Sequence, residues 1–225
     1  MMEGDTAYHL GRVLRAQPGQ LYELSDGHHV RLGRIEKVSR DRVDFALLEE
    51  IPAHEPAIDT TLLLSIVKFD AFEWAIEKAT ELGVSTIVPL AASRSEKALL
   101  AAAGKRAERW QKLLAEASQQ SRRLRVPVLQ AVSQPTQAFS AHAAAAAKIL
   151  LSEQPDAPPL RQILQGAPAR HKAVLAIGPE GGWNDAELSA AQTHSFCQAS
   201  LGKLILRTET AVAAALASIN YALGE

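Results

Sequence analysis

Two segments in the last quarter of the chain hold the residues best suited to chemistry. The first is the loop 178–182, Gly-Pro-Glu-Gly-Gly, which follows the apolar run 174–177. Its glycines allow a bulky ligand to approach the main chain, whose N–H and C=O groups can bind the polar edge of that ligand. The loop lacks the G-x-G-x-x-G spacing and the G-K-[ST] ending, so it supports neither a dinucleotide site nor a P-loop. By itself it could equally be a tight turn.

The second segment is 201–211, Leu-Gly-Lys-Leu-Ile-Leu-Arg-Thr-Glu-Thr-Ala. It runs from a strand into a helix, with Thr208 as a plausible N-cap and Glu209 near the positive end of the helix. Arg207 carries a permanent positive charge that can stabilise a developing anion. The simpler interpretation is that Thr208 and Glu209 only start the helix and that Arg207 is a surface charge.

Both segments lie in a pattern of alternating strands and helices that is typical of an open α/β domain with a parallel sheet. Ligands of such sheets bind at the carboxyl ends of the strands, where both loops lie. Asp70 is a candidate N-cap for the first helix of this part of the chain, which Gly83 ends. The pattern predicts strands over 62–67, 84–90, 148–151 and 173–177, and helices over 70–82, 105–121, 141–147 and 208–223.

A different pattern precedes this domain. Residues 19–50 contain short strands with period-two alternation and an Asp26-Gly27 turn, which is typical of a small β module. Residues 51–59 contain Pro52 and Pro56 and no periodicity, so we expect the linker there. The sequence therefore predicts a β domain over 1–57 and an α/β domain over 58–225.

The 225 residues carry a formal net charge of -1, so bulk electrostatics gives no argument for nucleic-acid binding. The charge is unevenly distributed, however. Between Arg94 and Arg125 there are nine basic residues and three acidic ones, and we expect an RNA backbone to lie there.

Other features exclude several classes of protein. No apolar run approaches the ~18 residues of a membrane span, and the first residues do not resemble a signal peptide, so we expect a cytoplasmic protein without a membrane partner. A single cysteine, Cys197, excludes an internal disulfide and a multi-thiolate zinc site, and we expect it in the core rather than as a nucleophile. The seven histidines lack metal-ligand spacing, so no metal is expected.

The two motifs as a pair resemble the SPOUT methyltransferases, and specifically the ribosomal RNA small subunit methyltransferase E family. The pair consists of I-G-P-E-G-G and, about twenty residues later, L-G-x-x-I-L-R-T-E-T-A. Further residues that fit this family are His9, Arg15, Lys68, Ser93, Arg94, Ser95, Trp110, Gln120, Arg123 and Pro127. The resemblance thus spans nearly the whole chain. Leu204 and Arg122 depart from the family pattern, which commonly has Arg at the first position and a small residue at the second.

The resemblance implies a fold and an activity. The fold would be a knotted (trefoil) open parallel sheet with helices, preceded by a small PUA-like β-barrel domain, and the knotted domains would form a homodimer. The activity would be S-adenosylmethionine-dependent methylation of N3 of one uridine in 16S rRNA of the small ribosomal subunit. Two other classes stay open, namely a SPOUT enzyme that methylates a ribose 2′-oxygen and a non-catalytic RNA-binding protein.

Site residues carried over by motif fall into three groups. The cofactor would be bound by Leu151, Ser152, Glu153, Ile177, Gly178, Pro179, Glu180, Gly181, Gly182, Leu201, Gly202, Ile205, Leu206, Arg207, Thr208, Thr210 and Ala211. RNA would be bound by His9, Arg12, Arg15, Arg94, Arg122, Arg123 and Arg125, with a structural hydrogen bond as the alternative for His9.

The catalytic group would consist of Arg207 and Glu209. Arg207 would stabilise the uracil oxyanion that develops as N3 loses its proton. Glu209 is a candidate general base, although a helix N-terminus stabilises its charge and makes it a weak one. The sequence leaves the identity of the base open.

Overall fold

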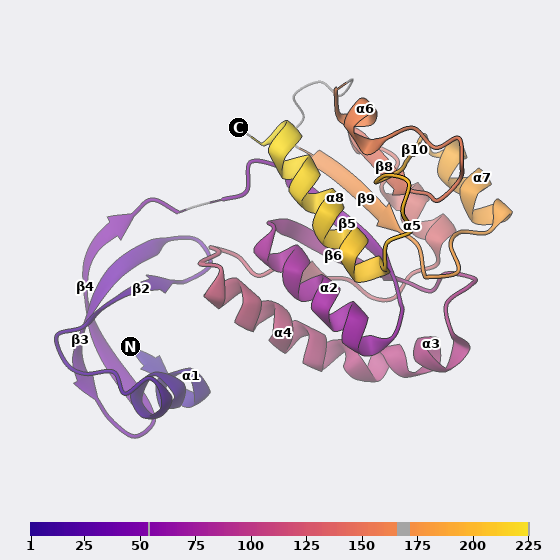
Figure 1. Ribbon diagram of the computed structural model, residues 1–225. Coiled ribbons are helices and arrows are strands. Elements are labelled where there is room, and N and C mark those ends of the chain that lie inside the picture. Colours follow the sequence, from indigo (N-terminus) through magenta and orange to yellow (C-terminus); the bar gives the residue numbers. More distant parts are fainter. Residues whose placement is uncertain (54, 166–171, 225) are drawn as a thin grey trace. The chain divides into compact units, whose positions relative to one another are not determined.

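The computed structural model describes residues 1–53, 55–165 and 172–224 (Figure 1). Its contacts divide the chain into two compact units, Met1–His54 and Glu55–Glu225. The division falls inside the predicted linker. The linker is shorter than expected, because one strand continues to Ile51 and the next begins at Asp59.

The first unit is an antiparallel sheet with a short helical segment at its start. The sheet order is β1-β4-β3-β2, so the described strands form an open sheet with β1 and β2 at its edges. Its elements are β1 (Met2–Glu3), α1 (Gly4–Tyr8), a π-helical turn (His9–Val13), β2 (Leu21–Ser25), β3 (Val30–Val38) and β4 (Arg42–Ile51). A small core of Ala7, Leu10, Ala16, Ile35 and Val43 joins the helical segment to the sheet.

The turn between β2 and β3 lies where the sequence predicts it. Its Asp26 carboxylate accepts hydrogen bonds from the backbone N–H groups of His28, at 2.8 Å, and His29, at 2.7 Å. The bonds from His29 and His28 lower the pKa of Asp26 to about 2. Gly27 has a φ of +85°, a conformation that glycine adopts without strain.

The second unit contains a six-stranded parallel sheet in the order β10-β8-β9-β5-β6-β7. Its strands are β5 (Asp59–Ser65), β6 (Val84–Leu90), β7 (Val128–Leu129), β8 (Ala147–Leu151), β9 (Lys172–Ile177) and β10 (Cys197–Ala199). Its α-helices are α2 (Phe69–Glu81), α3 (Lys97–Ala103), α4 (Ala107–Gln120), α5 (Pro135–Ala141), α6 (Leu160–Gln165), α7 (Asp185–Thr193) and α8 (Thr208–Leu223). The predicted open α/β sheet is confirmed.

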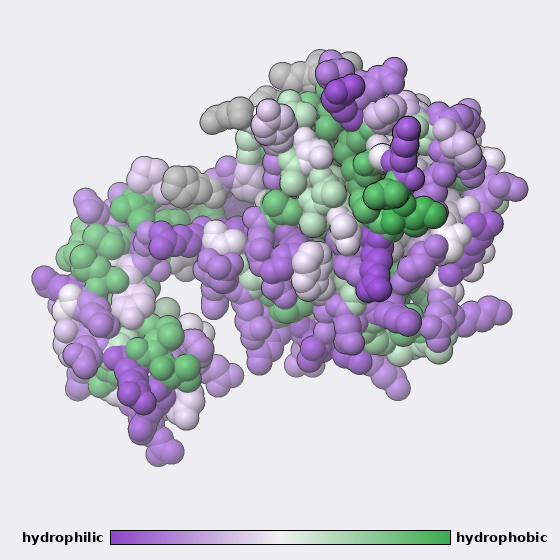
Figure 2. All heavy atoms as spheres, viewed as in Figure 1, coloured by the Kyte–Doolittle hydropathy of each residue, from purple (hydrophilic) through white to green (hydrophobic). Residues whose placement is uncertain are grey.

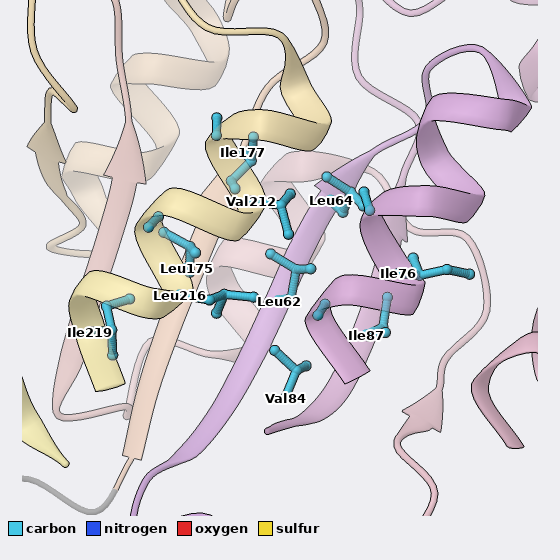
Figure 3. Packing of buried hydrophobic residues seen from close by; sticks show 14 of the residues in the cluster. Leu62, Leu64, Ile76, Val84, Ile87, Leu175, Ile177, Val212, Leu216 and Ile219 are labelled. Atoms are coloured by element: carbon cyan, nitrogen blue, oxygen red, sulfur yellow. The ribbon is translucent and has the colours of Figure 1, made fainter. Parts of the chain in front are cut away.

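Helices cover both faces of this sheet, which explains why its central strands are apolar without alternation. Leu62 and Leu64 of β5 belong to the core beneath α2 and α8, where they meet Val212 and Leu216 of α8 (Figure 3). Leu63 of the same strand belongs to a second core, under α5 and α7. Each of these side chains is fully buried or nearly so. The first core also contains the strand ends Ile177 and Ala199, after which the two loops begin.

Three local predictions are wrong. Asp70 does not cap α2, because the helix already begins at Phe69 with Lys68 as its N-cap. The alanine-rich segment 141–147 is not a helix: α5 starts at Pro135, a favoured first helical residue, and ends at Ala141, since the chain must turn into β8 by Ala147. Cys197 is exposed rather than in the core, because β10 is an edge strand and Cys197 is its first residue.

Candidate functional site

The two sequence motifs follow β9 and β10, which flank the same strand of the sheet. Strand β8 lies between β9 and β10. The three strands are parallel, so their carboxyl ends, at Ile177, Leu151 and Ala199, share one edge of the sheet. The segments that follow them enclose a cavity of about 900 Å³. This is the edge at which open α/β sheets bind their ligands.

The walls of this cavity contain nearly every predicted cofactor residue. Of that set only Thr210 is not part of the lining. Arg207, predicted as catalytic, also lines the cavity, whereas Glu209 does not. The structure therefore brings the two motifs together around one cavity, and in the first turn of α8 only Glu209 and Thr210 lie outside its lining.

Several lining residues are missed by the sequence analysis. The cavity extends along the segment after β8, which contributes Gln154, Pro155, Ala157 and Pro159. An isolated bridge between Pro159 and Ser200 joins this segment to the end of β10. The available signal was the proline-rich run Gln-Pro-Asp-Ala-Pro-Pro over 154–159, separated from the apolar run 149–151 by two residues, a typical place for a ligand-binding loop.

The glycine loop is shaped by the protein's own side chains. A Cβ at Gly178 would lie 3.1 Å from the indole of Trp183, and one at Gly181 would lie 3.2 Å from Cβ of Arg94. Gly182 has a φ of +69°, which also favours glycine. Besides the close approach of a ligand that the sequence predicts here, Gly178 and Gly181 are thus packed closely against side chains of the protein itself.

Trp183 anchors the same loop to the neighbouring strand. Its side chain is only 7% exposed, and its Nε1 donates a hydrogen bond to the carbonyl oxygen of Leu151 at 2.9 Å. Its ring also packs against Phe139, with centroids 5.8 Å apart. Trp183 therefore fixes the spacing between the ends of β8 and β9, which form two walls of the cavity.

A buried carboxylate holds a third segment against the glycine loop. Glu187 accepts hydrogen bonds from the backbone N–H of Ser93, at 2.8 Å, and of Asn184, at 2.9 Å, while its own N–H donates to Asn184 Oδ1 at 2.7 Å. The pair Asn184 and Glu187 forms a capping box at the start of α7. Because Arg94 follows Ser93, this network also sets the position of Arg94, whose Nη1 donates to the Gly181 carbonyl at 2.7 Å.

The second loop is joined to the first through Thr208. Thr208 is the first residue of α8 and is 5% exposed, and its hydroxyl donates to the carbonyl oxygen of Gly178 at 3.4 Å. The N-cap of α8 is Arg207, not Thr208 as predicted. Preceding it, Leu204 and Ile205 are 83% and 80% exposed. The loop thus combines one buried contact at its end with an apolar tip in solvent.

Comparison with known proteins shows that this chain is similar to RNA methyltransferases. Residues 54–220 match the family model of an RNA methyltransferase domain. A ribosomal RNA small subunit methyltransferase E from Synechocystis is 35% identical over 219 residues, covering 96% of this chain and 71% of that protein. The protein of the same name from Bacillus subtilis is 32% identical over 228 residues, covering 97% of this chain and 88% of its own length. The chain belongs to the ribosomal RNA small subunit methyltransferase E family.

Solved structures extend the similarity to the fold. The ribosomal RNA small subunit methyltransferase E from Neisseria gonorrhoeae, bound to S-adenosylmethionine, has a TM-score of 0.87 and 30% identity, covering 96% of this chain and 89% of that one. A Legionella pneumophila protein in complex with the same cofactor has a TM-score of 0.85 and 28% identity, covering 99% and 94%. The family resemblance inferred from the motifs is therefore confirmed.

The RNA residues predicted for this family member differ in their surroundings. Arg123 is half-buried, and its Nη1 donates to the carbonyl oxygens of Thr80, at 2.8 Å, and Val84, at 2.7 Å. Burial lowers the pKa of Arg123 from its ordinary value. These bonds join the end of α2 to the start of β6, so Arg123 has a structural role.

The other predicted RNA residues are exposed. Nη2 of Arg125 lies 3.6 Å from Oε1 of Glu55. Arg122 has a φ of +56° and lies in a turn after α4. His9, Arg12 and Arg15 lie in and just after the π-helical turn of the first unit. These side chains remain accessible to a ligand.

Within residues 1–53, 55–165 and 172–224, no group of three or more His, Cys, Asp or Glu side chains is arranged to hold a metal ion. None of the helices described in this part of the chain is long and apolar enough to cross a membrane.

Proposed function

We propose that this protein transfers a methyl group from S-adenosylmethionine to N3 of one uridine in 16S rRNA of the small ribosomal subunit. The observation that carries the proposal is that both motif loops and Arg207 line one and the same cavity. Membership of the family supports a ribosomal RNA substrate. The choice of base N3 rests on the family resemblance of the two motifs.

The residues of the cavity fit S-adenosylmethionine. Its volume of about 900 Å³ lies within the range of small-molecule pockets. Apolar side chains suited to the adenine ring are provided by Leu151, Ile177 and Leu206, while Glu153 and Glu180 are carboxylates suited to the ammonium group and the sulfonium of the cofactor. When bound, the cofactor supplies an electrophilic methyl group on a sulfonium.

Arg207 is the residue that we place at the reacting base. It is exposed, lines the cavity and immediately precedes α8. A guanidinium there stabilises the negative charge that uracil gains as N3 loses its proton, and a preorganised donor of this kind is worth about 10²- to 10³-fold in rate. Alignment of methyl donor and acceptor by the two loops supplies a further part of the acceleration.

Glu209 receives a different role. It lies in the first turn of α8 but not in the cavity wall. A carboxylate stabilises the positive end of a helix. We propose that Glu209 supports the helix start that presents Arg207 and that it does not remove the N3 proton itself.

We propose that each unit binds RNA through exposed basic residues of its own. In the methyltransferase domain these are Arg94, Arg122 and Arg125. In the first unit, whose antiparallel sheet we propose to be a PUA-like RNA-binding module, they are His9, Arg12 and Arg15. Exposed cations of this kind bind phosphates without regard to base sequence. Arg123 supports the surface of the methyltransferase domain from inside through its bonds to Thr80 and Val84.

The oligomeric state is part of the same proposal. Figure 2 shows a hydrophobic patch on the second unit where Figure 1 draws the loop that leads into α8, the loop that carries Leu204 and Ile205. Exposed apolar patches mark interaction sites. We propose that this loop packs against a second copy in a homodimer, that the C-terminal part of the domain forms a trefoil knot, and that the enzyme acts on ribosomal subunits in the cytoplasm.

Mapping of modified nucleosides tests the proposed function. 16S rRNA from cells with and without the protein is digested and examined by mass spectrometry, and we expect one 3-methyluridine to disappear with the protein. A methyl group on the ribose would instead indicate a 2′-O-methyltransferase. Absence of S-adenosylmethionine binding in calorimetry would indicate an RNA-binding protein without catalysis.

A further inference from the structure

Arg94 connects two parts of the molecule that are far apart in sequence. It lies in the loop after β6, and its Nη1 donates a hydrogen bond of 2.7 Å to the carbonyl oxygen of Gly181, 87 residues further along the chain. The stem of the same side chain packs where a Cβ at Gly181 would lie, with contacts of 3.2 and 3.4 Å. Arg94 therefore covers the glycine loop and restrains its main chain at the same time.

The backbone that carries Arg94 is itself anchored. The N–H of Ser93 donates to the buried carboxylate of Glu187, and the N–H of Ser95 donates to the carbonyl oxygen of Ala92 at 3.0 Å. Glu187 is 4% exposed and belongs to the capping box of α7, the helix that follows the glycine loop. The main chain that carries Arg94 is thus held in place, while its side chain is exposed and reaches Gly181 through one hydrogen bond.

The guanidinium also has capacity for a second ligand. Arginine carries five N–H donors in a planar fork, and the bond to Gly181 uses one of its nitrogens. The side chain is exposed and belongs to the lining of the cavity. The remaining donors and the positive charge therefore lie at the cavity wall and are accessible from solvent.

We propose that Arg94 is a positioning residue that couples RNA binding to cofactor binding. With one nitrogen it holds the Gly181 carbonyl and so the cofactor loop, and with the others it binds a phosphate oxygen next to the target nucleotide. A phosphate on the guanidinium orders the Arg94 side chain, and the ordered side chain holds the loop in its cofactor-binding form. This inference rests on the proposed function, because it takes the cavity as the cofactor site and RNA as the substrate.

Coupling of this kind is reciprocal. If RNA raises the affinity for the cofactor by some factor, the cofactor raises the affinity for RNA by the same factor. Lysine cannot replace arginine here, since a single ammonium on a flexible stem lacks the planar fork that reaches the carbonyl and the phosphate together. Glutamine at this position keeps an N–H donor for Gly181 but has no charge for a phosphate.

The experiment compares Arg94→Ala, Arg94→Gln and Arg94→Lys with Lys172→Ala in the full chain. Lys172 is a matched exposed cation at the opposite end of β9, where it lies 3.7 Å from Asp59. The affinity for S-adenosylhomocysteine, which prevents turnover, is measured by equilibrium dialysis with and without saturating small ribosomal subunits from cells that lack the protein. Binding of the subunits is measured as a function of salt.

For the wild-type chain and Lys172→Ala we expect the subunits to tighten S-adenosylhomocysteine binding about tenfold, within the usual range of coupling between sites. In Arg94→Ala we expect the subunits to tighten S-adenosylhomocysteine binding by less than about twofold. The slope of log affinity for the subunits against log salt concentration should fall in magnitude by about one, which is the effect of losing one phosphate contact. Arg94→Gln should keep the affinity for S-adenosylhomocysteine alone, and Arg94→Lys should keep the salt slope, while neither keeps the coupling.

A coupling factor in Arg94→Gln and Arg94→Lys equal to that of the wild type would overturn the proposal. These two variants carry the test if Arg94→Ala melts at a lower temperature than the wild type. Wild-type protein that binds S-adenosylhomocysteine without any effect of the subunits also overturns it and leaves the proposed methylation intact. A wild-type chain that binds no S-adenosylhomocysteine contradicts the proposed function instead.

Discussion

The two loops that line the cavity differ in what holds them. Residues 178–182 are fixed within the chain by the indole of Trp183, the guanidinium of Arg94 and the capping box of α7. Residues 201–207 are held at their end by Thr208, but their tip exposes Leu204 and Ile205 almost completely. One loop is preorganised by the fold, while the other presents apolar side chains that a second molecule can bury.

This difference assigns the loops separate tasks. A loop whose glycines are packed against the protein's own side chains can offer main-chain groups to a ligand at no further cost in ordering. An exposed apolar loop tip makes few contacts within its own chain. Burying it against a second molecule is favourable in free energy, because apolar surface is removed from water. We therefore expect substitutions at the first loop to act on folding and cofactor binding, and substitutions at the second to act on catalysis and assembly.

The largest effect should come from the end of the second loop. Arg207→Ala removes the charge that we place at the uracil oxyanion, and we expect methylation of small ribosomal subunits to fall by about 10²- to 10³-fold. Affinity for S-adenosylmethionine, measured by calorimetry, should change by less than about threefold, because we place Arg207 at the target base and assign the cofactor contacts to other residues of the cavity. Near-normal methylation by this variant would refute the catalytic role of Arg207.

At the first loop, Trp183→Ala should destabilise the domain by about 3 kcal/mol, since it removes a large buried side chain. Trp183→Phe keeps the ring volume in part and loses the bond to the Leu151 carbonyl, so about 1 kcal/mol is expected. Urea denaturation measures both, and calorimetry should show weaker S-adenosylmethionine binding in the same order. Equal stability of the two variants would mean that the indole is not the anchor of the loop.

The tip of the second loop tests the assembly. We expect the double substitution Leu204→Ser and Ile205→Ser to weaken a homodimer by about tenfold or more, because both side chains are exposed in the single chain and would be buried in a dimer. Analytical ultracentrifugation measures the dissociation constant. Thermal stability measured at protein concentrations where the chain is monomeric should stay unchanged. A dimer of unaltered strength would place the interface elsewhere.

The smallest effect should come from Glu209. Because its side chain is not part of the cavity wall, we expect Glu209→Gln to reduce methylation by less than about threefold, the size of an exposed helix-terminus effect. Rates under single-turnover conditions measure the chemical step directly. A loss of a hundredfold or more would return Glu209 to the role of general base.

Local pattern in the sequence determined much of this protein. Helix α8 has the predicted bounds, 208–223, and the strands β6, β8 and β9 lie within one residue of their predicted ranges. Gly178 and Pro179 after the apolar run 174–177 predict the first loop. These features follow from side-chain periodicity and turn chemistry, which neighbouring residues settle among themselves.

Tertiary structure alone decided how the pieces of the site are joined. Arg94 meets Gly181 and Glu187 meets Ser93 across about ninety residues of sequence, and Trp183 reaches Leu151 on the adjacent strand. These contacts exist because β9 lies between β8 and β5 and because β6 lies next to β5, an order that no local pattern contains. For the same reason the exposure of Cys197 and the exclusion of Glu209 from the cavity could not be predicted: both depend on which element lies at an edge and which residue of a helix turn meets a cavity.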